Sequence, residues 1–207
     1  MLNGLYVITD EEICPGRTHV EIARAALAGG AKIIQLRDKN ASDKGFYEAA
    51  MAIRTLTSGA GALFFVNDRV HIAAAVQADG VNVGQDDIPV SAARGILGPK
   101  AIIGLSCASV DQAVEAKGQG ADYVGFGPVF PTYTKQDAGP VSGIENLRLV
   151  CEKVNLPVVA IGGIGASNIA AVAAAGAAGA AVISAIVCAE DMTQATKDLL
   201  RRFQEQR

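Results

Sequence analysis

The sequence has no tryptophan, few aromatic residues (5%) and only four cysteines among its 207 residues. Cys14, Cys107, Cys151 and Cys188 lie far apart and form no C-x-x-C pair. This spacing excludes a dense disulfide framework and a clustered zinc site. It predicts reduced, buried thiols in a cytoplasmic protein.

Runs of basic residues are also absent. Lys and Arg total 18 against 21 Asp and Glu, which gives a net charge of -3. Because no basic patch is available to displace phosphate counterions, we do not expect nucleic acid as a partner. Hydrophobic residues make up 50% of the chain, which excludes a disordered protein. The length predicts a single domain over residues 1–207.

Two further absences concern membranes. The N-terminal MLNGLYVITD has no basic residue before its apolar stretch, so we expect no signal peptide. From Val154 to Ala189 there is no charged residue, a length that could cross a bilayer. Its alanines and glycines are weakly hydrophobic, however, and Pro157 and the Gly162-Gly163 pair divide it into shorter pieces. The sequence therefore predicts no membrane span.

Short apolar runs do recur along the chain, each followed by a turn and a helical pattern. The runs are Leu5–Thr9, Lys32–Leu36, Ala62–Val66, Gly80–Val83, Ala101–Leu105, Tyr123–Phe126, Val158–Ile161 and Ala181–Ser184. Most lack apolar–polar alternation, which is typical of parallel strands buried on both faces. Between them, apolar residues recur three and four apart, as in helices. Ser109 and Ser167 are predicted helix N-caps.

Eight strand–helix units predict an α/β fold, a single-domain (β/α)8 TIM barrel. An open, doubly wound sheet uses the same local units and is the alternative. No G-x-G-x-x-G follows the first run, and polar residues follow nearly every run. A barrel would bring these polar residues to one mouth, whereas an open sheet would scatter them. We therefore predict the barrel.

Charged residues after the second, third and fourth runs indicate a phosphate and metal site. Arg37 and Lys39, two residues apart, are predicted to share a face and bind one phosphate or diphosphate. The alternative is a pair of surface charges neutralised by acidic neighbours. Asp68 and Asp87 suit Mg2+, with phosphate oxygens and water completing its coordination. Alone, each would more often be a turn or cap residue.

A second anion site is predicted after the later runs. Gly162 and Gly163 follow the seventh run, and the backbone after Ile183 lies at the end of the eighth. Barrels of this type often bind phosphate there through backbone amides. The alternative is a turn that needs glycine for its conformation. The long loop from 127 to 140, with Lys135, is predicted to act as a lid, or else is an ordinary connection.

No nucleophile–histidine arrangement can be assembled from these residues. His19 and His71 lie at predicted helix starts, where surface or capping roles are expected. Cys107 has no histidine near it in sequence, so we expect a packed thiol. The predicted chemistry is electrostatic stabilisation of a leaving group.

Several stretches together resemble the thiamine-phosphate synthase family. They are LYVITD, QLRDK, VNDRV, ADGVNVGQDD, GLS, ADYVGFGPVFPTYTKQDAGP, VVAIGGI and VISAI, in the family order from Leu5 to Ile186. The resemblance implies a transferase that joins 4-amino-2-methyl-5-pyrimidinylmethyl diphosphate to 4-methyl-5-(2-phosphoethyl)thiazole. The products are thiamine phosphate and diphosphate, formed by a dissociative, Mg2+-assisted substitution with one Mg2+ per active site.

The resemblance also implies roles for individual residues. The pyrimidine diphosphate would be held by Gln35, Arg37, Lys39, Asn67, Ser106 and Lys135, of which Arg37, Lys39, Ser106 and Lys135 would be catalytic. Asp68 and Asp87 would bind Mg2+. The thiazole phosphate would be held by Thr132, Thr134, Gly162, Gly163, Ile183 and Ser184.

One position departs from the family pattern. Family members often have Ser-Ala-His where this chain has Ser106-Cys107-Ala108. Related thiazole tautomerases use a histidine there, so Ala108 weighs against that alternative. A non-catalytic protein that binds phosphate ligands is a further alternative. The uncharged, alanine-rich helix over 167–175 predicts a homodimer surface, unless its alanines are simply exposed.

Overall fold

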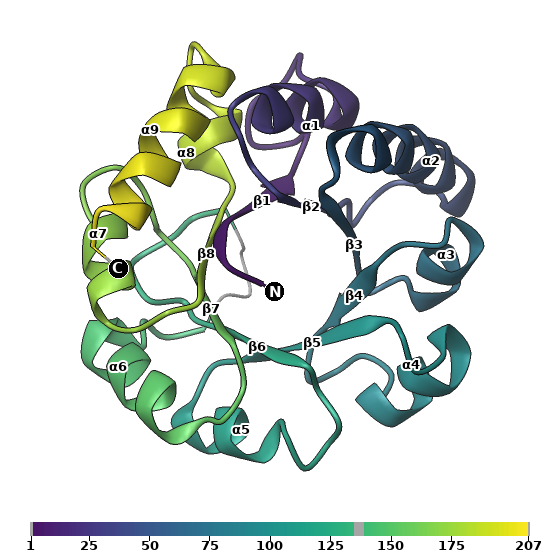
Figure 1. Cartoon of the computed structure of the whole chain (residues 1–207). Coiled ribbons are helices and arrows are strands. Elements are labelled where there is room, and N and C mark those ends of the chain that lie inside the picture. The colour runs from purple at the N-terminus through teal and green to yellow at the C-terminus, as the bar shows by residue number, and fades with distance from the viewer. Residues whose placement is uncertain (1, 135–138, 207) are drawn as a thin grey trace.

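The computed structural model describes residues 2–134 and 139–206, which form a closed barrel of eight parallel strands inside a ring of helices (Figure 1). The strands are β1 (Gly4–Thr9), β2 (Ile33–Leu36), β3 (Leu63–Asn67), β4 (Gly80–Val83), β5 (Ile102–Cys107), β6 (Tyr123–Phe126), β7 (Val158–Ile161) and β8 (Gly179–Val182). The helices are α1 (His19–Ala28), α2 (Asp43–Ala60), α3 (Val70–Ala75), α4 (Val90–Leu97), α5 (Val110–Glu115), α6 (Gly143–Lys153), α7 (Ile169–Ala174), α8 (Ser184–Val187) and α9 (Met192–Gln204). Because β8 pairs with β1, the predicted barrel is confirmed and the open sheet is excluded.

Apolar side chains fill both the inside of the barrel and the layer between strands and helices. The inner cluster consists of Leu2, Tyr6, Ile8, Ile33, Phe65, Tyr123, Val159 and Ala181. The outer cluster includes Val7, Ile34 and Phe64, which alternate with inner residues along the same strands. Burial of both strand faces explains why the sequence lacks apolar–polar alternation.

The eighth strand begins and ends two residues earlier than predicted. The sequence predicts a strand at Ala181–Ser184, but β8 is Gly179–Val182. The register places Gly179 opposite Gly4 of β1, and a Cβ atom on Gly179 would lie 3.0 Å from the Gly4 oxygen. Ser184 instead begins α8, so it lies in the strand–helix turn.

One of the two predicted N-caps is confirmed. The Ser109 side chain accepts a hydrogen bond from the Gln112 N–H at 3.2 Å at the start of α5. The prediction for Ser167 is wrong, because Asn168 occupies the position before α7. The Asn168 Oδ1 accepts from the Gly165 N–H at 2.8 Å, which folds the preceding loop.

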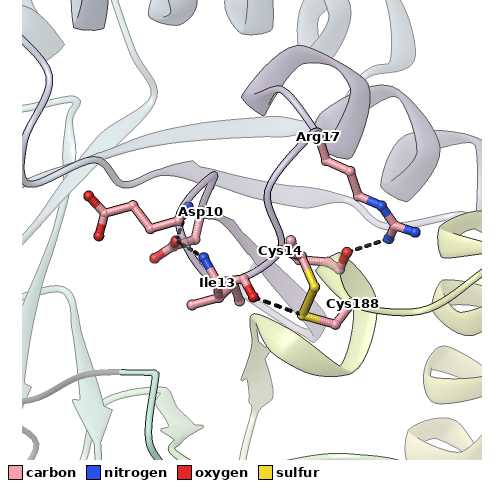
Figure 2. Close-up of a disulfide and its surroundings, with 7 residues drawn as sticks. Asp10, Ile13, Cys14, Arg17 and Cys188 are labelled. Carbon is pink, nitrogen blue, oxygen red and sulfur yellow. Dashed lines mark hydrogen bonds between the residues drawn. A yellow bond between two sulfur atoms is a disulfide. The ribbon is translucent and has the colours of Figure 1, made fainter.

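Cys14 and Cys188 form a disulfide, so the prediction of four reduced thiols is wrong for this pair (Figure 2). They are 174 residues apart in sequence, but closure of the barrel between β1 and β8 brings their Cα atoms to 5.6 Å. This separation is typical of disulfides. Arg17 Nη1 donates to the Val187 oxygen and makes a second link between the β1–α1 loop and α8.

The other two cysteines, Cys107 and Cys151, are free. Burial raises the pKa of the Cys107 thiol to about 12. Burial also raises the pKa of Cys151, to about 11. Both thiols are therefore protonated near neutral pH, as expected for packed cysteines.

The uncharged stretch from Val154 to Ala189 folds into several short elements. It contains β7, α7, β8 and α8, none longer than six residues. Across the part of the chain that the structure describes, no helix combines the length and hydropathy needed to span a membrane.

Candidate active site

Asp68 and Asp87 follow neighbouring strands, β3 and β4, and lie at the carboxyl ends of the barrel strands. Asp87 Oδ2 accepts from the Gly84 N–H at 2.7 Å, which closes the turn after β4. Asp68 has a left-handed backbone, with φ of 59°, and its N–H donates to the Asn82 oxygen at 2.9 Å. Left-handed residues other than glycine are uncommon, and strained positions of this kind cluster at functional sites.

The two carboxylates lie close enough to influence each other. Burial raises the pKa of Asp68, the Lys39 ammonium lowers it, and the negative charge of Asp87 raises it, with a net upward shift. Lys39 Nζ pairs directly with Asp68 Oδ2, while the Lys39 side chain is half exposed. Lys39 therefore partly neutralises Asp68 beside a second carboxylate, where a divalent cation would also be stabilised.

The donor set at this position fits Mg2+. Within residues 2–134 and 139–206 there is no group of three or more His, Cys, Asp or Glu that could hold a metal alone. Mg2+ commonly takes one or two carboxylates and completes its shell with substrate phosphates and water. Asp68 and Asp87 are two carboxylates of this kind, and they follow neighbouring strands.

Arg37 and Lys39 bind different carboxylates. β2 ends at Leu36, so neither residue lies on a strand, and the expectation of a shared strand face is wrong. Arg37 Nη1 donates to Asp10 Oδ2 at 2.8 Å, and both side chains are largely buried. Asp10 follows β1, and its Oδ1 accepts from backbone N–H groups of the next loop (Figure 2). Arg37 is therefore held rigidly beside the barrel mouth.

His19 lies deeper in the structure than its place at a helix start predicts. The expected surface or capping role is wrong, because this side chain is buried between the ends of β1 and β2. Its Nδ1 lies 2.8 Å from Thr9 Oγ1 and its Nε2 lies 3.3 Å from Asp38 Oδ2. His71 is exposed, as expected, and pairs with Asp43.

Gln35, Asn67 and Ser106 lie on β2, β3 and β5 respectively, close to the strand ends. Gln35 is buried, and Nε2 donates to the Tyr6 hydroxyl at 2.8 Å. Ser106 Oγ accepts from Asn82 Nδ2 at 2.9 Å. Sequence reasoning missed Tyr6 and Asn82 because each lies inside an apolar run that predicts only a buried strand.

On the other side of the mouth, the β6–α6 loop packs against the β7–α7 turn. The Phe130 N–H donates to the Gly162 oxygen at 3.0 Å. Gly163 has φ of +62°, and a Cβ atom there would lie 2.4 Å from the Pro131 oxygen. Glycine is therefore required at Gly163 both for backbone conformation and for close packing.

The residues predicted for the second anion site lie on these two segments and at the start of α8. Thr132 follows the segment that contacts the glycine turn, and its Oγ1 lies 3.4 Å from the Thr134 nitrogen, which donates to it. Ile183 and Ser184 form the start of α8. A Cβ atom on Gly165 would lie 3.9 Å from Ala185, so the turn also adjoins α8. Lys135 lies outside the described residues.

Comparisons with known proteins agree on one family. The model of a family described as thiamine monophosphate synthase matches residues 5–186. The thiamine-phosphate synthase of Methanospirillum hungatei is 53% identical over 195 residues, covering 94% of this chain and 94% of that protein. That of Chloroflexus aurantiacus is 48% identical over 195 residues, covering 94% of this chain and 90% of that protein.

A solved structure supports the same assignment. The thiamine phosphate pyrophosphorylase of Pyrococcus furiosus superposes with a TM-score of 0.91 at 48% identity, covering 99% of this chain and 96% of that one. The chain therefore belongs to the thiamine monophosphate synthase family.

Proposed function

We propose that this chain, as one catalytic domain over residues 1–207, joins 4-amino-2-methyl-5-pyrimidinylmethyl diphosphate to 4-methyl-5-(2-phosphoethyl)thiazole. The products are thiamine phosphate and diphosphate. The observation that supports the proposal is the presence of two different sets of polar groups at one barrel mouth, each suited to an anion. Carboxylates and cations follow β2, β3 and β4, and a glycine turn with hydroxyl groups follows β6, β7 and β8. The two substrates carry a diphosphate and a phosphate.

The pyrimidine diphosphate occupies the first arrangement in this proposal. Its binding residues are Gln35, Arg37, Lys39, Asn67, Ser106 and Lys135. Mg2+ held by Asp68 and Asp87 would supply positive charge to the diphosphate oxygens. Lys39 exchanges Asp68 for the diphosphate, and Arg37 remains anchored by Asp10, so both cations stabilise charge on the departing group.

The thiazole phosphate occupies the second arrangement, bound by Thr132, Thr134, Gly162, Gly163, Ile183 and Ser184. Anchoring the phosphate there holds the thiazole nitrogen close to the pyrimidine methylene carbon, where a carbocation forms as diphosphate departs. The nitrogen attacks with a lone pair that carries no proton. The substitution therefore needs no imidazole base, which agrees with the structural role of His19.

A homodimer through α7 is part of the proposal. Ala171 and Ala174 are exposed on this uncharged helix, so a second subunit could cover them without burying charge. If the helix lies in an interface, Ala171→Glu lowers the mass measured by light scattering. An unchanged mass would contradict the interface. A cytoplasmic location stays a prediction.

Product formation tests the reaction. Purified protein is mixed with both substrates, either with Mg2+ or with EDTA, and thiamine phosphate is measured by chromatography. We expect product only with Mg2+. Isomerisation of the thiazole phosphate without condensation would favour the tautomerase alternative, which Ala108 argues against. Ligand binding without any turnover would favour a binding protein.

A further inference from the structure

A continuous chain of side-chain hydrogen bonds crosses the inside of the barrel from β2 to β5. Gln35 Nε2 donates to the Tyr6 hydroxyl at 2.8 Å, and the Tyr6 and Tyr123 hydroxyl oxygens lie 3.1 Å apart. The Tyr123 hydroxyl donates to Asn82 Oδ1 at 3.0 Å. Asn82 Nδ2 then donates to Ser106 Oγ at 2.9 Å. The chain thus joins two residues of the proposed pyrimidine site.

The direction of every bond in this chain follows from its two ends. Tyr6 accepts from Gln35, and Tyr123 donates its single hydroxyl proton to Asn82. The bond between the tyrosines can therefore run only from Tyr6 to Tyr123. Reversing Gln35 alone would leave the two hydroxyl oxygens facing each other without a shared proton, and reversing Asn82 alone would leave the Tyr123 proton without an acceptor. Gln35 and Asn82 must consequently keep matched orientations.

Both tyrosines are held in place by packing. Tyr6 and Tyr123 are each 1% exposed, and the Phe65 ring lies 5.4 Å from the Tyr6 ring and 5.8 Å from the Tyr123 ring. A Cβ atom on Gly104 would lie 2.1 Å from the Tyr123 ring, so only glycine leaves room for it. Burial also raises the pKa of both hydroxyls, which keeps them protonated.

The chain of hydrogen bonds leaves one polar group available for a ligand at each end. The Gln35 nitrogen is engaged by Tyr6, and no described residue donates to its Oε1. At the other end, Ser106 Oγ accepts from Asn82, which leaves the Ser106 hydroxyl proton free to be donated. The site therefore offers an acceptor on β2 and a donor on β5.

We propose that Tyr6 and Tyr123 are positioning residues that fix the Gln35 carboxamide as an acceptor and thereby select a pyrimidine with a 4-amino group over its 4-oxo analogue. This inference rests on the proposed function. The amino group donates to Gln35 Oε1, whereas a carbonyl at the same position would face it as a second acceptor. A site built to bind a polar substrate group rejects analogues that lack it.

The test compares specificity in Tyr6→Phe and Tyr123→Phe, which keep the rings and remove one hydroxyl each. The ratio of kcat/KM for the 4-amino substrate to that for its 4-oxo analogue is measured for each variant. Without the hydroxyl, the Gln35 amide can rotate, so we expect the ratio to fall roughly tenfold or more. Tyr47→Phe, on the exposed face of α2, is the matched control and should keep the wild-type ratio.

The two hydroxyls belong to one chain, so the double variant should lose little more specificity than either single variant. A purely structural role would lower kcat/KM for both substrates equally. An unchanged ratio in both single variants, with an active wild type, overturns this inference alone. If Tyr6→Phe does not fold, Tyr123→Phe decides the question. Absence of product from the wild type would overturn the proposed function and this inference with it.

Discussion

Removal of the Cys14–Cys188 disulfide is predicted to lower the free energy of unfolding by about 5 kcal/mol. The bridge closes a loop of 174 residues in the unfolded chain. The chain-entropy relation gives an entropy loss of about 17 cal/mol/K for a loop of that length, or about 5 kcal/mol near room temperature. The native barrel already holds β1 beside β8, so the folded state gains little freedom when the bridge is removed.

Equilibrium urea unfolding of oxidised wild type and of Cys14→Ser/Cys188→Ser measures this difference. Intact mass after thiol alkylation establishes whether the wild-type bridge is present. The control is dithiothreitol, which should destabilise the wild type and leave the double variant unchanged. With the bridge present, unfolding free energies that agree within about 1 kcal/mol would refute the reasoning. Alkylation of Cys14 and Cys188 in the unreduced protein would refute the bridge itself.

Three further predictions concern the thiols, the buried ion pair and the metal carboxylates. The pKa values of Cys107 and Cys151 are raised to about 12 and about 11, so both thiols stay protonated at pH 8. They should therefore react with iodoacetamide only after unfolding, and fast labelling of the native protein would contradict this. Arg37→Met leaves Asp10 buried without its cation and should cost roughly 3–5 kcal/mol in urea unfolding, a loss that adding Asp10→Asn should partly restore. Asp87→Asn should lower turnover by about 100-fold or more at fixed Mg2+ and raise the Mg2+ concentration needed for half-maximal rate. If the variant turns over as fast as the wild type, this carboxylate holds no metal.

The barrel could be predicted from the sequence because local patterns determine most of it. Runs such as Val158–Ile161 are apolar without alternation, and β7 has the predicted bounds. The shift of β8 to Gly179–Val182 could not be predicted, since it depends on the register with β1 across the barrel closure. The disulfide escaped prediction for the same reason, because only closure brings Cys14 next to Cys188.

The candidate site was predictable where its residues directly follow strands. Asp68 and Asp87 follow adjacent strands, so the barrel topology alone brings them together. The partners of the cations were not predictable: Arg37 binds Asp10, which is 27 residues away in sequence. Tyr6 and Tyr123 were also missed, because a tyrosine within an apolar run gives no indication that its hydroxyl meets another across the barrel.

The central claim is that the pyrimidine diphosphate and the thiazole phosphate bind at opposite sides of one mouth. Steady-state kinetics of Lys39→Met and Gly163→Ala, with each substrate varied in turn, tests it most directly. The account predicts that Lys39→Met raises KM for the pyrimidine diphosphate and leaves KM for the thiazole phosphate near the wild-type value, while Gly163→Ala does the reverse. An increase in KM for the same substrate in both variants would contradict it.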